Sequence, residues 1–389
     1  MRLRIVRPLY GMKDSGNRWI KRMFRCLKEK GFAQCPSEPT LWLKPGKGYL
    51  IVYVDDVLWV SCGEGIQSEI DAIFAELKVG KTQILDIDAR NNDKQDSFRF
   101  LGTSLFRTSD GHIEIDMNDA AQKISPIEID KELKKQKDLK VPEKLVTQYR
   151  SLIGKISWLA MSVKPGLTTV SSMYAGRVPG VTVRDILELN AIVEKIDKSN
   201  NRLRFVNLHL DSCDDVFLYV YSDASLANRR DTSTQAGYCI FMGQDYRIRT
   251  EILVNIVSWS SRKLRRITRS TFGSELLSLD EAVDRAVYLK HLLENIFKSV
   301  RLVFLLDCKS ICSNIFSLNP QVTEQRLRPT LNGIKQTLEI EKADMFHVNG
   351  DKMAADVLTK VLKFNNYLKE ILRSNKIDTS TFNKVDHLT

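Results

Sequence analysis

Four carboxylates stand where the predicted strands and helices would bring them together: Asp223, Glu275, Asp307 and Asp356. The apolar strands at 216–223 and 302–307 both end in an aspartate, and the glutamate lies in the first turns of a helix predicted over 268–292. Asp356 lies near the start of another predicted helix, close to its favourable N-terminal dipole. Strand ends of an open α/β sheet are a common place for ligands, and crowded carboxylates are costly unless a cation neutralises them. The acids are therefore predicted to hold two divalent ions, about 3.5–4 Å apart, for phosphoryl chemistry. Each acid alone is better explained as a cap or an exposed residue; the order strand, helix, strand, helix is the specific signal.

A second acidic site is predicted at Asp55 and Asp56, in a turn between the β-rich runs 50–54 and 57–60. Adjacent carboxylates repel each other, and divalent metal coordination is the commonest reason to keep them at the tip of an apolar hairpin. Taken alone, the pair is better explained as an ordinary turn, because acids are frequent in turns. The neighbouring segments decide between these interpretations.

Three segments occur in the order Pro8-Leu9-Tyr10-Gly11-Met12-Lys13, Tyr53-Val54-Asp55-Asp56 and Phe100-Leu101-Gly102. Together they resemble the reverse transcriptase of copia-type retrotransposons. The resemblance implies that Asp55 and Asp56 are polymerase metal ligands. It also implies that the first segment lies near the template and the nucleotide, with Lys13 and Arg18 as nucleic-acid contacts, and that Phe100 and Gly102 belong to the primer-grip hairpin.

Further segments continue the family order. The segment 149–154 lies between the two catalytic regions, and 221–225, 257–263, 270–275, 306–310, 325–328 and 355–360 resemble the RNase H region of the same elements. The resemblance implies hydrolysis of RNA in RNA–DNA hybrids by Asp223, Glu275, Asp307 and Asp356 with Mg²⁺ (or Mn²⁺). Ser260, Lys263 and Arg269 are expected phosphate or ribose contacts. The sequence departs from the family pattern at Lys164-Pro165-Gly166 and at Pro329-Thr330, neither of which is a metal ligand.

The family takes a third polymerase carboxylate from a strand that precedes the Pro-Leu-Tyr-Gly segment, and this sequence begins seven residues before that segment. An incomplete polymerase, with no DNA synthesis by this chain alone, is therefore expected. Two alternatives stay open: a catalytically silent nucleic-acid-binding relic, and a subunit that another chain completes. His347, nine residues before Asp356, is expected to have a structural role at a strand end rather than that of a helper histidine.

The composition fits a protein that binds nucleic acid inside the cell. The formal net charge is +11, and basic residues concentrate in 1–30 and in 262–269. Such runs are compatible with phosphate contacts, although a solvated face explains either one alone. No apolar run is long enough for a membrane span and no signal sequence is evident, so a cytoplasmic location is expected, in a virus-like particle of the parent element, or a nuclear one. The seven cysteines show no paired C-x-x-C spacing and are expected to be reduced, with Cys308 and Cys312 in the core rather than on a metal.

These elements predict an α+β reverse transcriptase palm remainder and a helical thumb or connection, followed by an α/β RNase H-like domain with a mixed sheet. The expected boundaries are 1–118 for the partial palm, 119–212 for the mostly helical connection, 213–370 for the RNase H domain and 371–389 for a loose tail. Helices are expected at 19–30, 66–78, 146–160 and 183–196, and a hairpin at 98–117. The charged stretch 130–140 is predicted to be a solvated linker or an exposed helix.

Overall fold

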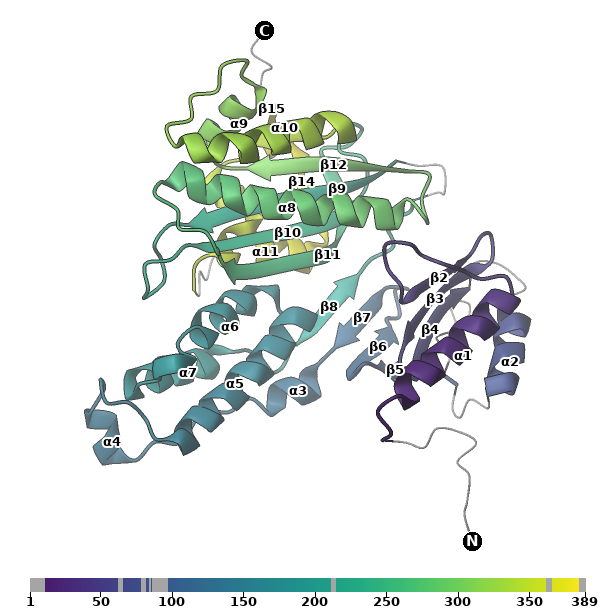
Figure 1. The fold of residues 1–389 in the computed structure, drawn as a ribbon, viewed down its shortest axis with the longest axis horizontal. Coiled ribbons are helices and arrows are strands. Elements are labelled where there is room, and N and C mark those ends of the chain that lie inside the picture. Colours follow the sequence, from purple (N-terminus) through teal and green to yellow (C-terminus); the bar gives the residue numbers. More distant parts are fainter. Residues whose placement is uncertain are drawn as a thin grey trace.

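The computed structural model describes residues 11–61, 66–77, 82–83, 85, 97–210, 215–361 and 366–384. These residues form three sheets of four, seven and four strands, with helices between and over them (Figure 1). The prediction of an α+β chain with a mixed C-terminal sheet is confirmed. Among the described residues, no helix combines the length and the apolar character that crossing a membrane requires.

The first sheet is an antiparallel meander with two helices packed on one face. Its elements are α1 (Ser15–Glu29), β1 (Ala33–Gln34), β2 (Leu41–Lys44), β3 (Gly48–Tyr53), β4 (Asp56–Ser61) and α2 (Ile66–Leu77). Helix α1 buries Met23, Cys26 and Leu27, whose spacing of three and one residues places them on one side of the helix. They join Trp42, Ile70 and other apolar residues of the sheet and α2 in one core. The acidic pair therefore sits at the tip of a hairpin whose base is well packed.

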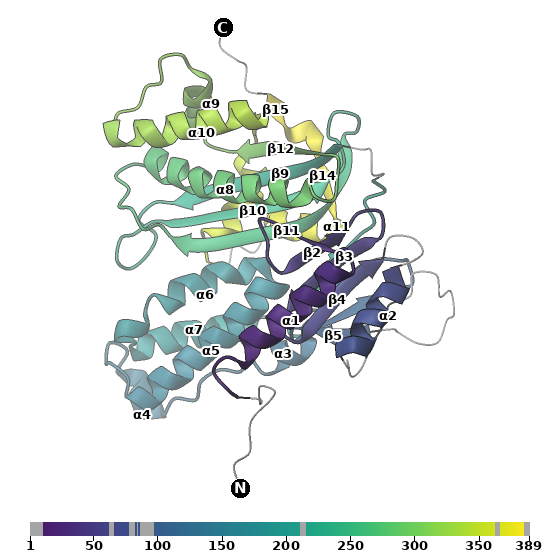
Figure 2. The same cartoon turned by 45° about the vertical axis from the view of Figure 1, so that its right-hand side comes forward.

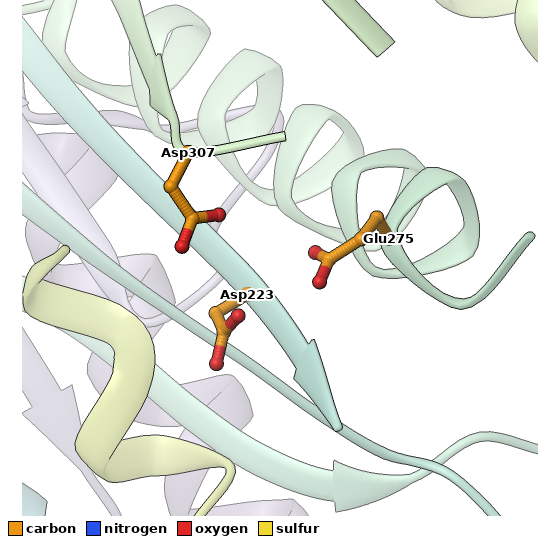
Figure 3. A group of neighbouring side chains, drawn as sticks. All are labelled: Asp223, Glu275 and Asp307. Carbon is orange, nitrogen blue, oxygen red and sulfur yellow. The ribbon is translucent and has the colours of Figure 1, made fainter. Parts of the chain in front are cut away.

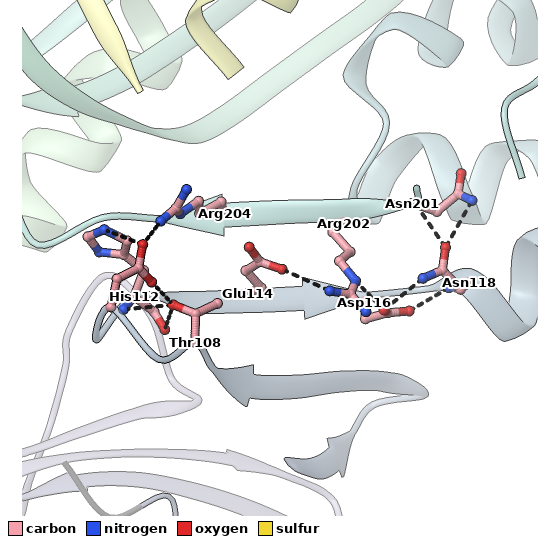
Figure 4. Close-up of polar contacts among 9 residues, drawn as sticks. Thr108, His112, Glu114, Asp116, Asn118, Asn201, Arg202 and Arg204 are labelled. Atoms are coloured by element: carbon pink, nitrogen blue, oxygen red, sulfur yellow. Dashed lines mark hydrogen bonds and ion pairs between the residues drawn. The ribbon is translucent and has the colours of Figure 1, made fainter. Parts of the chain in front are cut away.

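The second sheet is formed by residues that are distant in sequence. Strands β5 (Ser97–Phe100), β6 (Thr103–Arg107) and β7 (Ile113–Asp116) pair in order, and β8 (Arg202–Phe205) then pairs antiparallel with β7. Arg202 donates to Asp116 at 2.7 Å and lies 3.5 Å from Glu114, and Arg204 pairs with Asp110 (Figure 4). Residues of the predicted palm (1–118) and of the predicted connection (119–212) thus share one sheet.

Helices connect β7 to β8 and form a bundle next to this sheet: α3 (Asn118–Gln122), α4 (Lys131–Lys135), α5 (Glu143–Ser162), α6 (Thr168–Ala175) and α7 (Val183–Lys195), with 3-10 turns at Pro165–Leu167 and Val178–Gly180. The predicted helices in 146–160 and 183–196 are present as α5 and α7. The charged stretch contains α4, which buries no side chain, so its exposed-helix alternative holds for 131–135. Helix α6 was not predicted, because its Thr, Val and Ser residues have modest helix propensity and its form depends on packing.

The third sheet has the order β14-β11-β10-β9-β12-β13-β15. Its elements are β9 (Asp215–Ser225), β10 (Gln235–Gly243), β11 (Glu251–Lys263), α8 (Thr271–Leu293), β12 (Ser299–Leu306), α9 (Lys309–Phe316), α10 (Arg328–Glu341), β13 (Asp344–His347), α11 (Tyr367–Ser374), β14 (Lys376–Asp378) and β15 (Asn383–Lys384), with 3-10 turns at Gln325–Leu327, Gly350–Lys352, Ala354–Leu358 and Thr379–Thr381. Strands β9, β10 and β11 are antiparallel, whereas β9, β12 and β13 are parallel.

Both faces of this sheet are covered. Helices α8 and α10 lie over one face and α11 over the other (Figures 1 and 2). Along β9, Leu218 and Val220 pack toward α8 and α10, whereas Phe217, Tyr219 and Tyr221 belong to a core that also includes α5, α6 and α7. A strand that is buried on both faces has a continuous run of apolar residues, which is the pattern of the sequence at 216–221. The helical bundle and the large sheet therefore share one hydrophobic core.

The expected loose tail from 371 is wrong for the residues that the structure describes. Helix α11 continues to Ser374, and β14 adds an edge strand to β11. Ile371 and Ile377 are almost completely buried, and Asn375 caps the helix in a left-handed conformation with φ 53°. A few apolar anchors among mostly polar residues were sufficient to order the segment.

Candidate active site

Two neighbouring parallel strands bring the first pair of carboxylates together. Asp223 lies near the end of β9, and Asp307 directly follows β12. The strands are in register through Leu305 and Tyr221, so their carboxyl ends coincide. Glu275 faces this pair from the first turns of α8 (Figure 3). One ligand atom from each of the three side chains lies within 4.8 Å of the others.

Serine hydroxyls attach the start of α8 to the end of β9. Ser270 caps the helix by accepting from the Gly273 amide at 3.1 Å. One turn after Glu275, Ser278 donates to the Asp223 carbonyl at 2.8 Å, and its hydroxyl lies 3.1 Å from the Ser222 hydroxyl. These buried bonds fix the helix position along the strand. Glu275 is thereby held opposite Asp223.

Asp223 and Glu275 are buried and Asp307 is half-buried, and burial shifts the pKa values of all three. Asp223 and Glu275 are 3% and 8% exposed. Burial raises the pKa of Asp223 to about 6, opposed by the hydrogen bond from Thr359 and the charge of Lys360. Burial, followed by the charges of Asp223 and Asp307, raises the pKa of Glu275 to about 9. Burial also raises the pKa of Asp307. Such a set of oxygen ligands fits a divalent cation, because the cation would neutralise charges that now repel each other in a poorly solvated place.

Asp356 lies nearby but outside this group of three. It is 6% exposed, in the 3-10 turn Ala354–Leu358 rather than the predicted α-helix, and its carboxylate forms an ion pair with Lys360. Its charge contributes to the raised pKa values of Asp223 and Asp307, which places it within electrostatic reach of both. Because a five-residue 3-10 turn has little macrodipole, the lysine supplies the compensation that the helix prediction assigned to the dipole.

Two residues next to Asp356 contribute to the site and were not singled out from the sequence. Thr359 is buried and donates its hydroxyl to the Asp223 carboxylate. Lys360 is half exposed and contacts Asp356. Both lie in the matched segment 355–360, so the signal was present, but their roles become visible only when β9 and the 354–361 segment are placed side by side.

No model of a known protein family matches the chain. Among solved structures, the chain is similar to LC11-RNase H1, isolated from compost by a metagenomic approach, with 18% identity, 37% of this chain and 92% of that chain covered, and a TM-score of 0.28. The RNase H1 from the halophilic archaeon Halobacterium salinarum NRC-1 gives 16% identity, coverages of 40% and 98%, and a TM-score of 0.28. The foamy viral protease-reverse transcriptase in complex with an RNA/DNA hybrid gives 11% identity and a TM-score of 0.44, with 92% of this chain and 39% of that chain covered. The residues of the site therefore carry the functional argument.

The acidic hairpin differs from the buried cluster in every respect. Asp55 and Asp56 are exposed at the turn between β3 and β4. Val54 occupies the left-handed region with φ 55°, and Trp19 donates its indole N–H to the Val54 carbonyl at 2.7 Å. A β-branched residue in this region is strained, which is more common at functional turns than elsewhere. Among the described residues, no third potential ligand joins this pair.

The predicted nucleic-acid contacts fall in three places. Lys13 and Arg18 are exposed at the start of α1, where Arg18 also pairs with Asp14 at 2.6 Å. The first ten residues of the predicted basic run 1–30 lie outside the described residues. Phe100 ends β5, and Gly102 turns into β6 with φ 79°, so close to Trp158 that an ideal Cβ would lie 2.8 Å from its ring. No larger residue fits at Gly102 without displacing that indole.

The third group lies on β11 and in the segment just before α8. Ser260 is half-buried on β11, Lys263 ends that strand and pairs with Asp231, and Arg269 is exposed just before the α8 cap.

His347 ends β13 with Nε2 3.2 Å from the Asp307 carbonyl oxygen. Cys312 is buried and Cys308 is half-buried, both as free thiols.

Proposed function

We propose that this chain is a metal-dependent nuclease of the RNase H type, which hydrolyses the RNA strand of RNA–DNA hybrids, joined to a reverse transcriptase-like region. The observation that carries the proposal is the group formed by Asp223, Glu275 and Asp307, the first two buried and the third half-buried, which lie within 4.8 Å of one another. Burial of carboxylates without compensating cations is unfavourable, and it raises the pKa values of Asp223 and Glu275. Two parallel strand ends and a helix start are positioned to keep this arrangement.

Asp223, Glu275 and Asp307 would hold divalent ions, with Asp356 as a fourth ligand. Such ions supply an activated water and charge stabilisation for in-line displacement at phosphorus. The residues of the chain perform the positioning. Thr359 fixes the Asp223 carboxylate through its hydroxyl, and Lys360 places a cation beside Asp356 at a partly exposed position that a substrate phosphate can reach.

The choice of an RNA–DNA hybrid as substrate rests on the resemblance of 221–225, 270–275 and 355–360 to the copia-type RNase H region. The basic residues between Arg262 and Arg269 add positive charge before α8. For the hairpin, Asp55 and Asp56 would contribute two ligands to a polymerase site. We expect no primer extension by this chain alone, because no third carboxylate accompanies them within the described part of the chain.

The test is cleavage of an end-labelled RNA–DNA hybrid by the full chain with Mg²⁺, with Mn²⁺ and with EDTA. Asp223→Asn should lower the cleavage rate at least about 10³-fold, because metal-borne charge stabilisation is worth several kcal/mol. Asp284→Asn is the matched control: it removes an exposed carboxylate from the same helix as Glu275, and its rate should equal that of the wild type.

Equal cleavage by wild type and Asp223→Asn would reject the proposed site. A chain that binds the hybrid in a salt-dependent way but never cleaves it would be the silent relic instead. The ion pair between Lys360 and Asp356 is the observation that favours this second candidate, because the lysine already neutralises one of the four acids.

A further inference from the structure

Helix α6 contacts the segment that carries Asp356, although the two are far apart in sequence. Thr169 on α6 is fully buried and donates its hydroxyl to the Val357 carbonyl at 2.8 Å, across 188 residues. The preceding turn also approaches this segment, since an ideal Cβ on Gly166 would lie 3.6 Å from the Val357 side chain. The predicted connection region therefore contacts the proposed nuclease site directly.

The next carbonyl in the segment is held from the same side. Ser261 on β11 donates to the Leu358 carbonyl, and its hydroxyl lies 3.2 Å from that of Thr169. Gln235 on β10 then donates to Ser261 at 2.7 Å and to Ser172 of α6 at 3.1 Å. Two consecutive carbonyls, 357 and 358, are thus fixed by hydroxyls of α6 and the sheet.

These carbonyls lie between the two residues that matter for the acids. Asp356 precedes them, and Thr359, which donates to the Asp223 carboxylate, follows them. The 3-10 turn Ala354–Leu358 spans only five residues, and the hydrogen bonds of such a turn are too poor in geometry to fix its own position. The donors outside the turn, together with the packing of its buried side chains, therefore set where Asp356 and Thr359 lie.

We propose that Thr169 is a positioning residue of the acid site, so that helix α6 is a structural part of the nuclease centre. The role of Thr169 in holding 356–359 stands on the contacts alone, and its effect on metal binding rests on the proposed function. Thr169 touches neither substrate nor metal; it acts through the 357 carbonyl on Asp356 and, through Thr359, on Asp223. Partners outside the ligand set typically change metal affinity by about 10–100-fold when they are removed.

The neighbouring Thr168 offers a matched control. It is also buried, but its hydroxyl donates at 2.5 Å to the Pro165 carbonyl, in the 3-10 turn directly before α6. Thr168→Val and Thr169→Val each remove one buried hydroxyl and keep the side-chain shape. A loss of stability common to both variants is structural, whereas an effect on the 354–361 segment or on metal binding should belong to Thr169→Val alone.

The experiment uses the full chain and two measurements. Amide hydrogen exchange needs no metal: in Thr169→Val, the amides of 356–360 should exchange at least about tenfold faster than in wild type, as expected for one lost buried hydrogen bond. Titration with Mn²⁺, followed by the signal of the free ion, should show about tenfold weaker binding in Thr169→Val. Thr168→Val should match the wild type in both, and Thr169→Ser should restore both.

Exchange of 356–360 that is equal in the two valine variants would overturn the inference. The proposed function would survive that result as long as wild-type Mn²⁺ binding is lost in Asp223→Asn. Conversely, wild type without Asp223-dependent Mn²⁺ binding would reject the proposed function, while the exchange data would still decide whether Thr169 holds the segment. Unchanged Mn²⁺ affinity in Thr169→Val, beside normal wild-type binding, would also count against a positioning role.

Discussion

The two acidic regions keep their carboxylates in opposite environments. Asp55 and Asp56 lie in water at the tip of a hairpin, where the cost is a strained backbone at Val54. Asp223 and Glu275 lie on regular strand and helix backbone, where the cost is desolvation that raises both pKa values. In the first region the cost is backbone strain, and in the second it is the free energy of ionising buried carboxyl groups. A cation would relieve only the second directly.

This difference explains why the same residue type gives unequal functional evidence. Exposed acids in a turn are common and cost little, so the hairpin alone would not require a ligand. Buried acids are costly unless positive charge compensates them, and here two buried acids and one half-buried acid lie within 4.8 Å of one another. Burial therefore separates the two regions more clearly than the number of acids does.

Metal-dependent stability should show the largest difference between the regions. At about 100 times the dissociation constant, Mg²⁺ or Mn²⁺ should raise the free energy of unfolding by about 2.7 kcal/mol, since the ion binds only the folded state. Asp307→Asn should abolish most of this gain because it removes one of the three grouped ligands. Asp55→Asn should leave it intact. Denaturant unfolding with metal or with EDTA measures both, and equal losses in the two variants would erase the proposed distinction.

The cost of ionising the buried carboxyl groups predicts a smaller effect when metal is absent. Removal of one of these groups should then raise the free energy of unfolding. Because the pKa of Glu275 is raised to about 9, the fold binds this proton more tightly than the unfolded chain does. The stability contributed by this tighter proton binding is fully present below the ordinary carboxyl range near pH 4. It is lost as the pH rises through about 6 for Asp223 and about 9 for Glu275. Glu275→Gln should therefore stabilise the EDTA-treated protein at pH 7, by on the order of 2 kcal/mol.

The pH dependence provides the check on this prediction. In EDTA, the free energy of unfolding should fall more steeply between pH 5 and pH 9 in wild type than in Glu275→Gln. Asp284→Asn, on the exposed side of the same helix, should keep the wild-type slope. A glutamine variant that is less stable than wild type at pH 7 without metal would show that the carboxylate is not destabilising.

The sequence predicted the elements that local periodicity specifies. The strand ends at Asp223 and Asp307 and the helix carrying Glu275 follow from continuous apolar runs and from one apolar helix stripe, and the hairpin at Asp55 follows from β-rich flanks. What the sequence did not predict depends on contacts between distant segments. Helix α6 and the order of residues 371–384 depend on a core shared with the large sheet, and no local pattern reports such packing.

Asp356 illustrates the same limit within the site. Its proximity to the other acids was expected, but the segment forms a 3-10 turn, and hydroxyls from α6 and β11 donate to its carbonyls. Nothing in the sequence of 355–360 indicates that residues of α6 and β11 donate hydrogen bonds to this segment. The acids of the site could thus be predicted from the sequence. The conformation of the segment that carries Asp356 depended on hydrogen-bond partners 97 and 188 residues away.

A glycine behind the buried cluster tests how tightly this packing is set. Gly237 pairs with Asp223 across β9 and β10, and an ideal Cβ there would lie 2.6 Å from the Leu358 Cβ and 2.9 Å from its carbonyl oxygen. Gly237→Ala should lower the free energy of unfolding by about 1–2 kcal/mol, because backbone must shift, and should weaken Mn²⁺ binding as 356–359 moves. Gly333→Ala, at an open helical position, should instead stabilise by up to about 1 kcal/mol. Unchanged Mn²⁺ binding in Gly237→Ala would mean that the segment can move without disturbing the acids.

The smallest expected effect belongs to the hairpin, where relief should come from the backbone. Asn tolerates the left-handed conformation better than a β-branched residue, so Val54→Asn should raise the free energy of unfolding by about 0.5–1 kcal/mol. Val60→Asn is the control: Val60 is similarly exposed, at 54% against 46%, but lies on β4, where asparagine is disfavoured and should destabilise slightly. Thermal unfolding of both variants measures the difference. If Val54→Asn is no more stable than Val60→Asn, the hairpin stores no backbone strain, and the two acidic regions differ only in the burial of their charges.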